Sequence, residues 1–206
     1  MKNKKNLLSE LYKMKLFGYN YTEKSKNQKN DNIILPNDIN ELNTRINYCS
    51  LCELSKISKS KVSHLNNLEN KIVILVPFVL NKSNYNILNN ITKKYLNINI
   101  ENILILNLIK CNNNEININE KCFDICKDYT IKQLEILNPK SILSFGDVYE
   151  YIISDKLEIG QKIRYNTSDM YYLNNLEFIA RNPSCIEKYE NLFNKIKNDM
   201  ERIWDT

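Results

Sequence analysis

The sequence predicts an α/β fold, a three-layer sandwich in which helices cover a central four-stranded, mostly parallel sheet. Four short runs rich in Ile, Leu and Val follow one another after residue 70, and each has the length and composition of a buried strand. Segments with helical periodicity separate these runs, which is typical of βαβ units. A chain of 206 residues, 43% of them hydrophobic, is long enough to bury one sizeable core.

The residues before this pattern are expected to form two appendages. Leu7, Leu11 and Met14 recur at helical spacing, so we expect a short amphipathic helix within residues 1–19. Residues 20–44 are polar with little periodicity, and we expect a flexible linker there. The domain itself is expected to occupy residues 45–206.

The elements of that domain follow from the same periodicities. The predicted strands lie within residues 71–78, 101–110, 139–146 and 176–183. The predicted helices cover residues 84–95, 120–137 and 147–154. Apolar residues at alternating spacings of three and four predict a long closing helix whose stripe faces the core. These residues are Ile186, Tyr189, Phe193, Ile196, Met200 and Ile203.

Unusual residues fall where each predicted strand ends. They are Pro77-Phe78, Asn107, Gly146 and Asn182-Pro183. Open α/β sheets bind their ligands at the carboxyl ends of the strands, so we expect the functional site at this edge.

Composition narrows the class of protein. The net charge of +5 suits a polyanionic partner such as DNA without demanding one. Glu10 and Lys13 interrupt the apolar start, so it lacks a signal-peptide core, and no apolar run approaches the roughly 20 residues that span a bilayer. We therefore expect a soluble, cytoplasmic monomer with no membrane partner. In a reducing compartment its six cysteines are better read as metal ligands or redox groups than as disulfides.

Five of the cysteines are grouped in a way that suggests ligation. Cys49 and Cys52 form a C-x-x-C pair, Cys111 follows the second predicted strand, and Cys122 and Cys126 lie one helical turn apart. Four thiolates complete either a tetrahedral zinc site or a cubane iron–sulfur cluster. The alternative is that Cys111, Cys122 and Cys126 are small buried apolar residues.

Four segments in order carry a resemblance to a known family. They are "CSLCEL" at 49–54, "NLIKC" at 107–111, "CKDYTIKQL" at 126–134 and "NPKSILSFG" at 138–146. Together they resemble the iron–sulfur uracil-DNA glycosylases, usually called family 4, over about residues 45–204 of the chain. The resemblance implies a uracil-DNA glycosylase-like fold and a DNA repair enzyme that hydrolyses the N-glycosidic bond of uracil or another damaged base.

The resemblance also implies a cofactor and its ligands. A 4Fe-4S cluster, chiefly structural, would be held by Cys49, Cys52, Cys111 and Cys126, with Cys122 as the alternative fourth ligand. Such a cluster ties the chain before the first strand to the loop after the second. Cys185 matches no ligand of the family, and we expect it to be a packed thiol.

Two residues are implied to contact the base. Asn107 matches the asparagine that reads the uracil edge, because its amide both donates and accepts hydrogen bonds. Phe78 matches a ring that stacks on the base, although a core position is an equal alternative.

Two parts of the family's catalytic machinery are missing. The acidic, glycine-rich loop that follows the first strand is absent, and Asn182 stands where relatives carry the histidine of a His-Pro motif. An amide donates a hydrogen bond but carries no positive charge, so we expect reduced or altered activity. His64, the one histidine of the chain, is expected on the surface.

Two other functions remain open. A catalytically silent iron–sulfur DNA-binding protein would keep the fold and the cluster, with Lys56, Lys59 and Lys61 contacting phosphate or simply forming a solvated face. A four-cysteine zinc protein is the third alternative.

Overall fold

The computed structural model describes residues 35–58, 60–62, 72–112, 118, 120–153 and 156–204. These belong to a compact unit that begins at Leu35. The predicted N-terminal helix, Lys59 and His64 lie outside the described residues, as does the side chain of Cys185.

A five-stranded mixed sheet in the order β3-β2-β5-β7-β6 forms the centre of this unit. Its members are β2 (Ile72–Val76), β3 (Leu104–Asn107), β5 (Ser141–Phe145), β6 (Lys162–Tyr165) and β7 (Ser168–Leu173). The first four in spatial order run parallel, and β6 pairs antiparallel with β7 at the edge. The predicted α/β class is confirmed. The prediction of four strands is wrong, because the sheet has a fifth strand, β6, at its edge.

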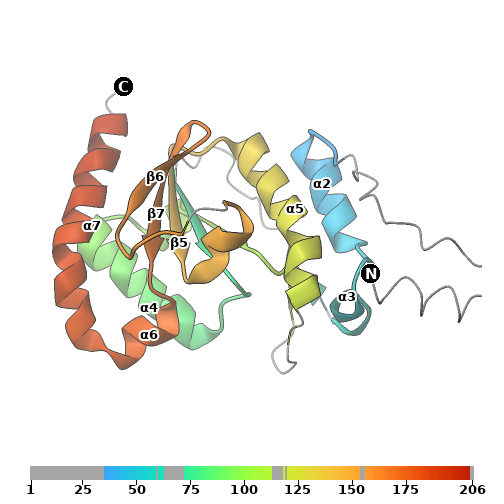
Figure 1. Ribbon diagram of the computed structural model, residues 1–206, viewed down its shortest axis with the longest axis horizontal. Helices are drawn as coiled ribbons and strands as arrows, with labels where there is room; N and C mark the ends of the chain where they lie inside the picture. The colour runs from blue at the N-terminus through green and yellow to red at the C-terminus, as the bar shows by residue number, and fades with distance from the viewer. Residues whose placement is uncertain are drawn as a thin grey trace, which may run out of the picture. The chain divides into compact units, whose positions relative to one another are not determined.

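Helices cover both faces of the sheet (Figure 1). One face packs against α4 (Lys82–Ile91), the π-helical turn η1 (Thr92–Leu96), α6 (Leu176–Arg181) and α7 (Pro183–Trp204). The other face packs against α5 (Glu120–Leu137) and the 3₁₀ turn η3 (Asp147–Tyr151). A short 3₁₀ turn, η2 (Ile100–Asn102), precedes β3. The alternation of buried residues along β2 explains the two layers, because Val73 and Leu75 face α5 while Ile74 faces α4.

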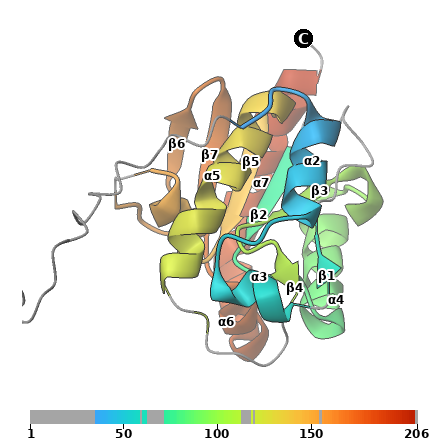
Figure 2. The ribbon, with the colours of Figure 1, turned by 90° about the vertical axis from the view of Figure 1, so that its right-hand side faces the viewer.

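Further elements lie around α5 (Figure 2). They are α2 (Ile39–Asn47), α3 (Glu53–Ile57), β1 (Ser60–Lys61) and β4 (Cys111–Asn112). The β1 and β4 strands pair antiparallel to form a small second sheet.

The linker predicted for residues 20–44 ends too late, because α2 already begins at Ile39. Asp38 caps this helix, since its carboxylate accepts hydrogen bonds of 2.9 Å from the backbone N–H groups of Asn40 and Glu41. Leu42 and Ile46 are buried against α5. The polar composition of this segment led to the prediction of a linker, although its last residues belong to the short amphipathic helix α2.

The strand predicted at residues 176–183 is also wrong, because this stretch forms α6 and the start of α7. Asn175 sets the start of α6, since its side-chain oxygen accepts a 2.7 Å hydrogen bond from the Phe178 N–H. The fourth parallel strand is instead β7, which is rich in Tyr and polar residues. A tight turn with Asn166 at φ 50° joins it to β6.

The edge strand β6 carries charged side chains at alternate positions. Lys162 lies 3.4 Å from Asp169 and 3.2 Å from Asp199, and Arg164 lies 2.8 Å from Asp169. These ion pairs connect β6 to β7 and to α7. Within the described residues no helix is long and apolar enough to span a membrane.

We predict that Gly146→Ala lowers the free energy of unfolding by about 1–3 kcal/mol, because φ 76° and ψ −172° form a region that is nearly restricted to glycine. An added Cβ would also lie 3.3 Å from the Cβ of Asn175. Urea denaturation measures the change. Asn86→Ala, at an exposed position of α4, is the control, with an expected change within about 0.5 kcal/mol. Equal unfolding midpoints for the two variants would contradict the assignment.

Candidate functional site

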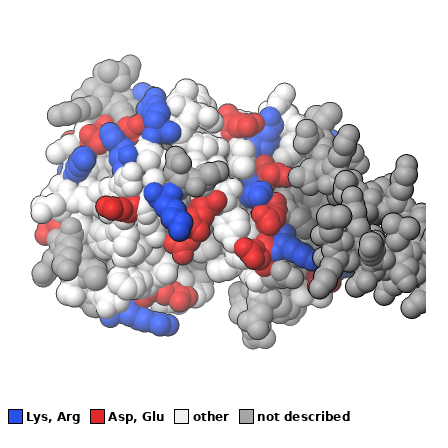
Figure 3. Space-filling model, in the orientation of Figure 1, with Lys and Arg blue, Asp and Glu red and all other residues white. Residues whose placement is uncertain are grey.

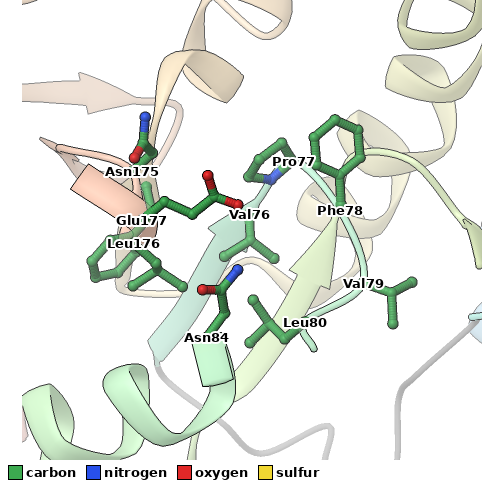
Figure 4. A pocket seen from close by; sticks show the side chains of 10 residues that line it. Val76, Pro77, Phe78, Val79, Leu80, Asn84, Asn175, Leu176 and Glu177 are labelled. Carbon is green, nitrogen blue, oxygen red and sulfur yellow. The ribbon is translucent and has the colours of Figure 1, made fainter. Parts of the chain in front are cut away.

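A pocket of about 180 Å³ opens at the carboxyl edge of the sheet (Figure 4). The chain passes from β2 to β3 on one side and later returns to β5 on the other side, so the topological switch point lies between β2 and β5. The pocket lies there. Its lining residues are Val76, Pro77, Phe78, Val79, Leu80, Asn84, Phe145, Asn175, Leu176 and Glu177.

Helix starts position the polar side chains of this pocket. Asn81 caps α4 by accepting a 2.8 Å hydrogen bond from the Asn84 N–H, which places Asn84 in the first turn. Asn175 caps α6, and Glu177 lies in the first turn of that helix. Asn84, Asn175 and Glu177 were not predicted as site residues, because Asn and Glu are common at helix starts for purely structural reasons. In the sequence, only their position shortly after the end of a strand could have indicated that these residues belong to the site.

Phe78 lies on the pocket wall with 43% of its surface exposed, so it is not a core residue. Its ring meets Phe123 edge to face at 5.7 Å between centroids. Phe123 in turn stacks on Tyr151 at 5.0 Å. This aromatic row supports Phe78 from behind and leaves part of its ring open to a ligand.

Asn107 ends β3 and is only 5% exposed. It pairs in register with Val76, which lines the pocket. Leu106 and Leu108 face the α5 side, so Asn107 faces the α4 side, as Val76 does. Asn107 thus lies beside the pocket wall without being one of its lining residues.

Asn182 does not lie at the end of a strand, contrary to prediction. It is the C-cap of α6, and its side-chain amide donates a 3.0 Å hydrogen bond to the Phe178 carbonyl. The residue that follows β7 at the carboxyl edge and reaches the pocket is Asn175. The error follows directly from reading α6 as a strand.

A short ladder brings the C-x-x-C segment to Cys111. Lys61 of β1 pairs with Cys111 of β4, and the Val62 N–H donates a 2.8 Å hydrogen bond to the Lys110 carbonyl. The Lys61 ammonium donates a 2.5 Å hydrogen bond to the Cys49 carbonyl. Residues from before the first strand of the main sheet are therefore tied to the segment after its second strand.

Most of the cysteines share one apolar cluster. Cys52, Cys111, Cys122 and Cys126 are all buried in it, together with Leu54 and Ile109. Cys49 is half-buried and packs against the neighbouring cluster of α2 and Tyr129. Cys122 and Cys126 project from the same face of α5, as their i, i+4 spacing requires.

Burial and neighbouring thiols raise the pKa of Cys111 and Cys126. Burial raises the pKa of Cys111 to about 12, and the charges of Cys126, Cys52 and Cys49 raise it as well. Burial raises the pKa of Cys126 to about 11, with further contributions from Cys52 and Cys49, while a hydrogen bond from the Lys110 backbone lowers it. Both thiols are protonated near neutral pH in the metal-free chain, so binding of a metal centre would release protons.

Four thiolates around one zinc ion, with Zn–S bonds of about 2.3 Å, lie about 3.8 Å apart. In the part of the chain that the structure describes, no three His, Cys, Asp or Glu side chains lie close enough together to hold a metal ion.

A buried lysine connects the thiols to the sheet edge. Lys110 is 3% exposed, and its ammonium donates hydrogen bonds of 2.6 Å to the Gln133 side chain and 2.5 Å to the Asn107 carbonyl. Burial lowers its pKa to about 7, opposed by the nearby charge of Cys126. Lys110 therefore contacts Asn107 on one side and the cysteine cluster on the other.

The face seen in Figure 3 shows no patch of uniform positive charge that would suit a polyanionic partner. On the face seen in Figure 3, basic and acidic side chains are interspersed. Near the cysteines, Lys56 is exposed, whereas Lys61 is occupied by the Asn47 and Cys49 carbonyls. The exposed apolar side chains of Tyr48 and Leu51 lie in the same segment.

No model of a known protein family matches the chain, and no curated protein matches it significantly. The resemblance carried by the four sequence segments therefore stays a prediction.

Proposed function

We propose that this protein is a DNA glycosylase of the uracil-DNA glycosylase type, which hydrolyses the N-glycosidic bond of uracil or another damaged base and carries a 4Fe-4S cluster. The strongest support is that Cys52, Cys111 and Cys126, which come from three separate segments, share one buried cluster, with Cys49 packed against the neighbouring one. The grouping of the cysteines along the sequence leaves Cys122 and Cys126 as alternatives, and the family resemblance implies Cys126.

The thiols present can supply the four ligands that a cubane iron–sulfur cluster takes. A single tetrahedral zinc ion would take the same four thiols, so metal content decides between the two centres. Leu54 and Ile109 supply an apolar shell, which limits solvent access to such a centre. Cys49, Cys52, Cys111 and Cys126 are the proposed ligands, and the cluster would hold the α3–β1 segment against β4.

The pocket fits a flipped base. An apolar cavity of about 150 Å³ accepts a benzene ring, so a pocket of about 180 Å³ has room for one pyrimidine. Phe78 offers an exposed ring for stacking, and the Asn84 and Asn175 amides can donate to and accept from the base edge. Asn107 lies next to this wall and is proposed to complete the reading of the base after extrusion.

Stabilisation of the departing base in this pocket would depend on neutral donors. When the bond between the sugar and the base breaks, negative charge develops on the departing base, and amide N–H groups of Asn107 and Asn175 can stabilise it. An amide does so less strongly than a protonated imidazole. We therefore expect a slow enzyme.

We predict that the protein purified without oxygen is brown and contains about four iron and four sulfide per chain. Cys111→Ser should lose this centre, because it removes a buried thiol of the proposed ligand set. Visible absorbance and iron analysis measure the effect. Cys126→Ser should behave like Cys111→Ser, whereas Cys122→Ser should keep its iron. A colourless, zinc-loaded preparation would refute the cluster.

We predict that the protein releases uracil from DNA and that Asn107→Ala and Asn175→Asp each lower the single-turnover rate about 10- to 1,000-fold, because each removes an amide donor. The Asp variant retains a side-chain oxygen that can cap α6. Cleavage of abasic sites in a labelled oligonucleotide measures the rate.

The matched control is Asn182→Asp, which changes an amide at the far end of α6 and should alter the rate less than threefold. Unchanged rates in the Asn107 and Asn175 variants would reject the base-reading assignment. If no variant releases any base while all bind DNA with a steep salt dependence, the catalytically silent DNA-binding function is favoured instead.

A further inference from the structure

Glu177 occupies a distinctive place in the pocket. It projects from the first turn of α6, and in Figure 4 its carboxylate end lies toward Val76 and Pro77, at the end of β2. Among the described residues that line the pocket it alone carries a charge. The remaining walls are apolar or amide-bearing, so any ligand that enters meets one carboxylate.

Its carboxylate oxygens are available to a ligand. Within the described part of the chain, Glu177 takes part in none of the observed ion pairs or side-chain hydrogen bonds. Asp147 is the acidic residue that follows the end of β5. Its carboxylate already accepts a 2.9 Å hydrogen bond from the Tyr172 hydroxyl. Asp147 is also outside the pocket lining.

Hydrolysis of an N-glycosidic bond requires a group that orients water and faces the developing sugar cation. The segment after β2 cannot provide it, because Pro77, Phe78, Val79 and Leu80 bear no acid. The opposite wall, where α6 begins, does provide one. A carboxylate there both attracts positive charge on the sugar and accepts a proton from water.

Resting on the proposed glycosylase function, we propose that Glu177 is the catalytic carboxylate of this pocket. The bond between C1′ and the base nitrogen breaks, and its electron pair leaves with the base as an anion. A water oxygen bonds to C1′, and the proton that this water loses passes to the Glu177 carboxylate. Protonation of the base anion and deprotonation of Glu177 then restore the starting state.

The test compares Glu177→Gln with Glu41→Gln, in the intact, cluster-loaded protein. Both exchanges neutralise an exposed glutamate in the first turn of a helix, but Glu41 belongs to α2 and lies outside the pocket lining. Single-turnover release of uracil should fall about 100-fold or more in Glu177→Gln, and by less than twofold in Glu41→Gln. Binding of uracil-containing DNA should change less than threefold in both.

A second variant separates chemistry from structure. Glu177→Ala should be slow in the same assay, and added formate should restore part of the rate by supplying a carboxylate in the vacated space. Formate should leave the wild-type rate and the Glu41→Gln rate unchanged. A side chain with a merely structural role would show no such rescue.

The outcomes distinguish the two proposals. If the wild type releases uracil and Glu177→Gln does so within threefold of it, or if formate fails to accelerate Glu177→Ala, the role of Glu177 is overturned while the glycosylase function stands. If the wild type releases no base from uracil- or other lesion-containing DNA, the proposed function fails, and the role of Glu177 fails with it.

Discussion

Strand β2 is hydrogen-bonded in parallel to β3 on one side and to β5 on the other, and all of its side chains are buried. Parallel neighbours require that each connection cross a face of the sheet, so helices must cover both sides. The same arrangement makes the chain leave β2 in one direction and return in the other, which opens the pocket at the carboxyl edge. Fold and site therefore share one origin.

Much of the fold could be predicted because its signals are local. The strands β2, β3 and β5 are apolar runs, and the bounds predicted for α5, 120–137, agree with those observed. The end of the chain was harder, because β7 carries Tyr and polar residues whereas the apolar run after it is helical. A side-chain cap from Asn175 decided between helix and strand there, and the apolar pattern alone does not reveal such a cap.

The candidate site also has residues that the sequence indicated and residues that it did not. The cysteines that we propose as ligands stand out in the sequence through their grouping, because ligation restricts both residue type and spacing. Asn84, Asn175 and Glu177 stayed hidden, because in a chain rich in Asn they resemble ordinary helix starts. Only the three-dimensional convergence of two helix starts on the end of β2 distinguishes them.

Lys110 gives the thiol region and the sheet edge a common support. Its ammonium holds the Asn107 carbonyl, its backbone hydrogen bonds to Cys126, and its neighbour Cys111 belongs to the β1–β4 ladder. A shift of Cys126 would therefore be transmitted to Asn107 through the backbone and the ammonium of Lys110.

The outer strand β6 has a consequence for the behaviour of the molecule at high concentration. An unpaired strand edge invites a second copy to add to the sheet, and lysine or arginine on that edge is a common natural defence. Lys162 forms ion pairs with Asp169 and Asp199, and Arg164 forms one with Asp169, so charged side chains lie on the outer strand β6. Self-templated fibril growth through this rim is thereby disfavoured.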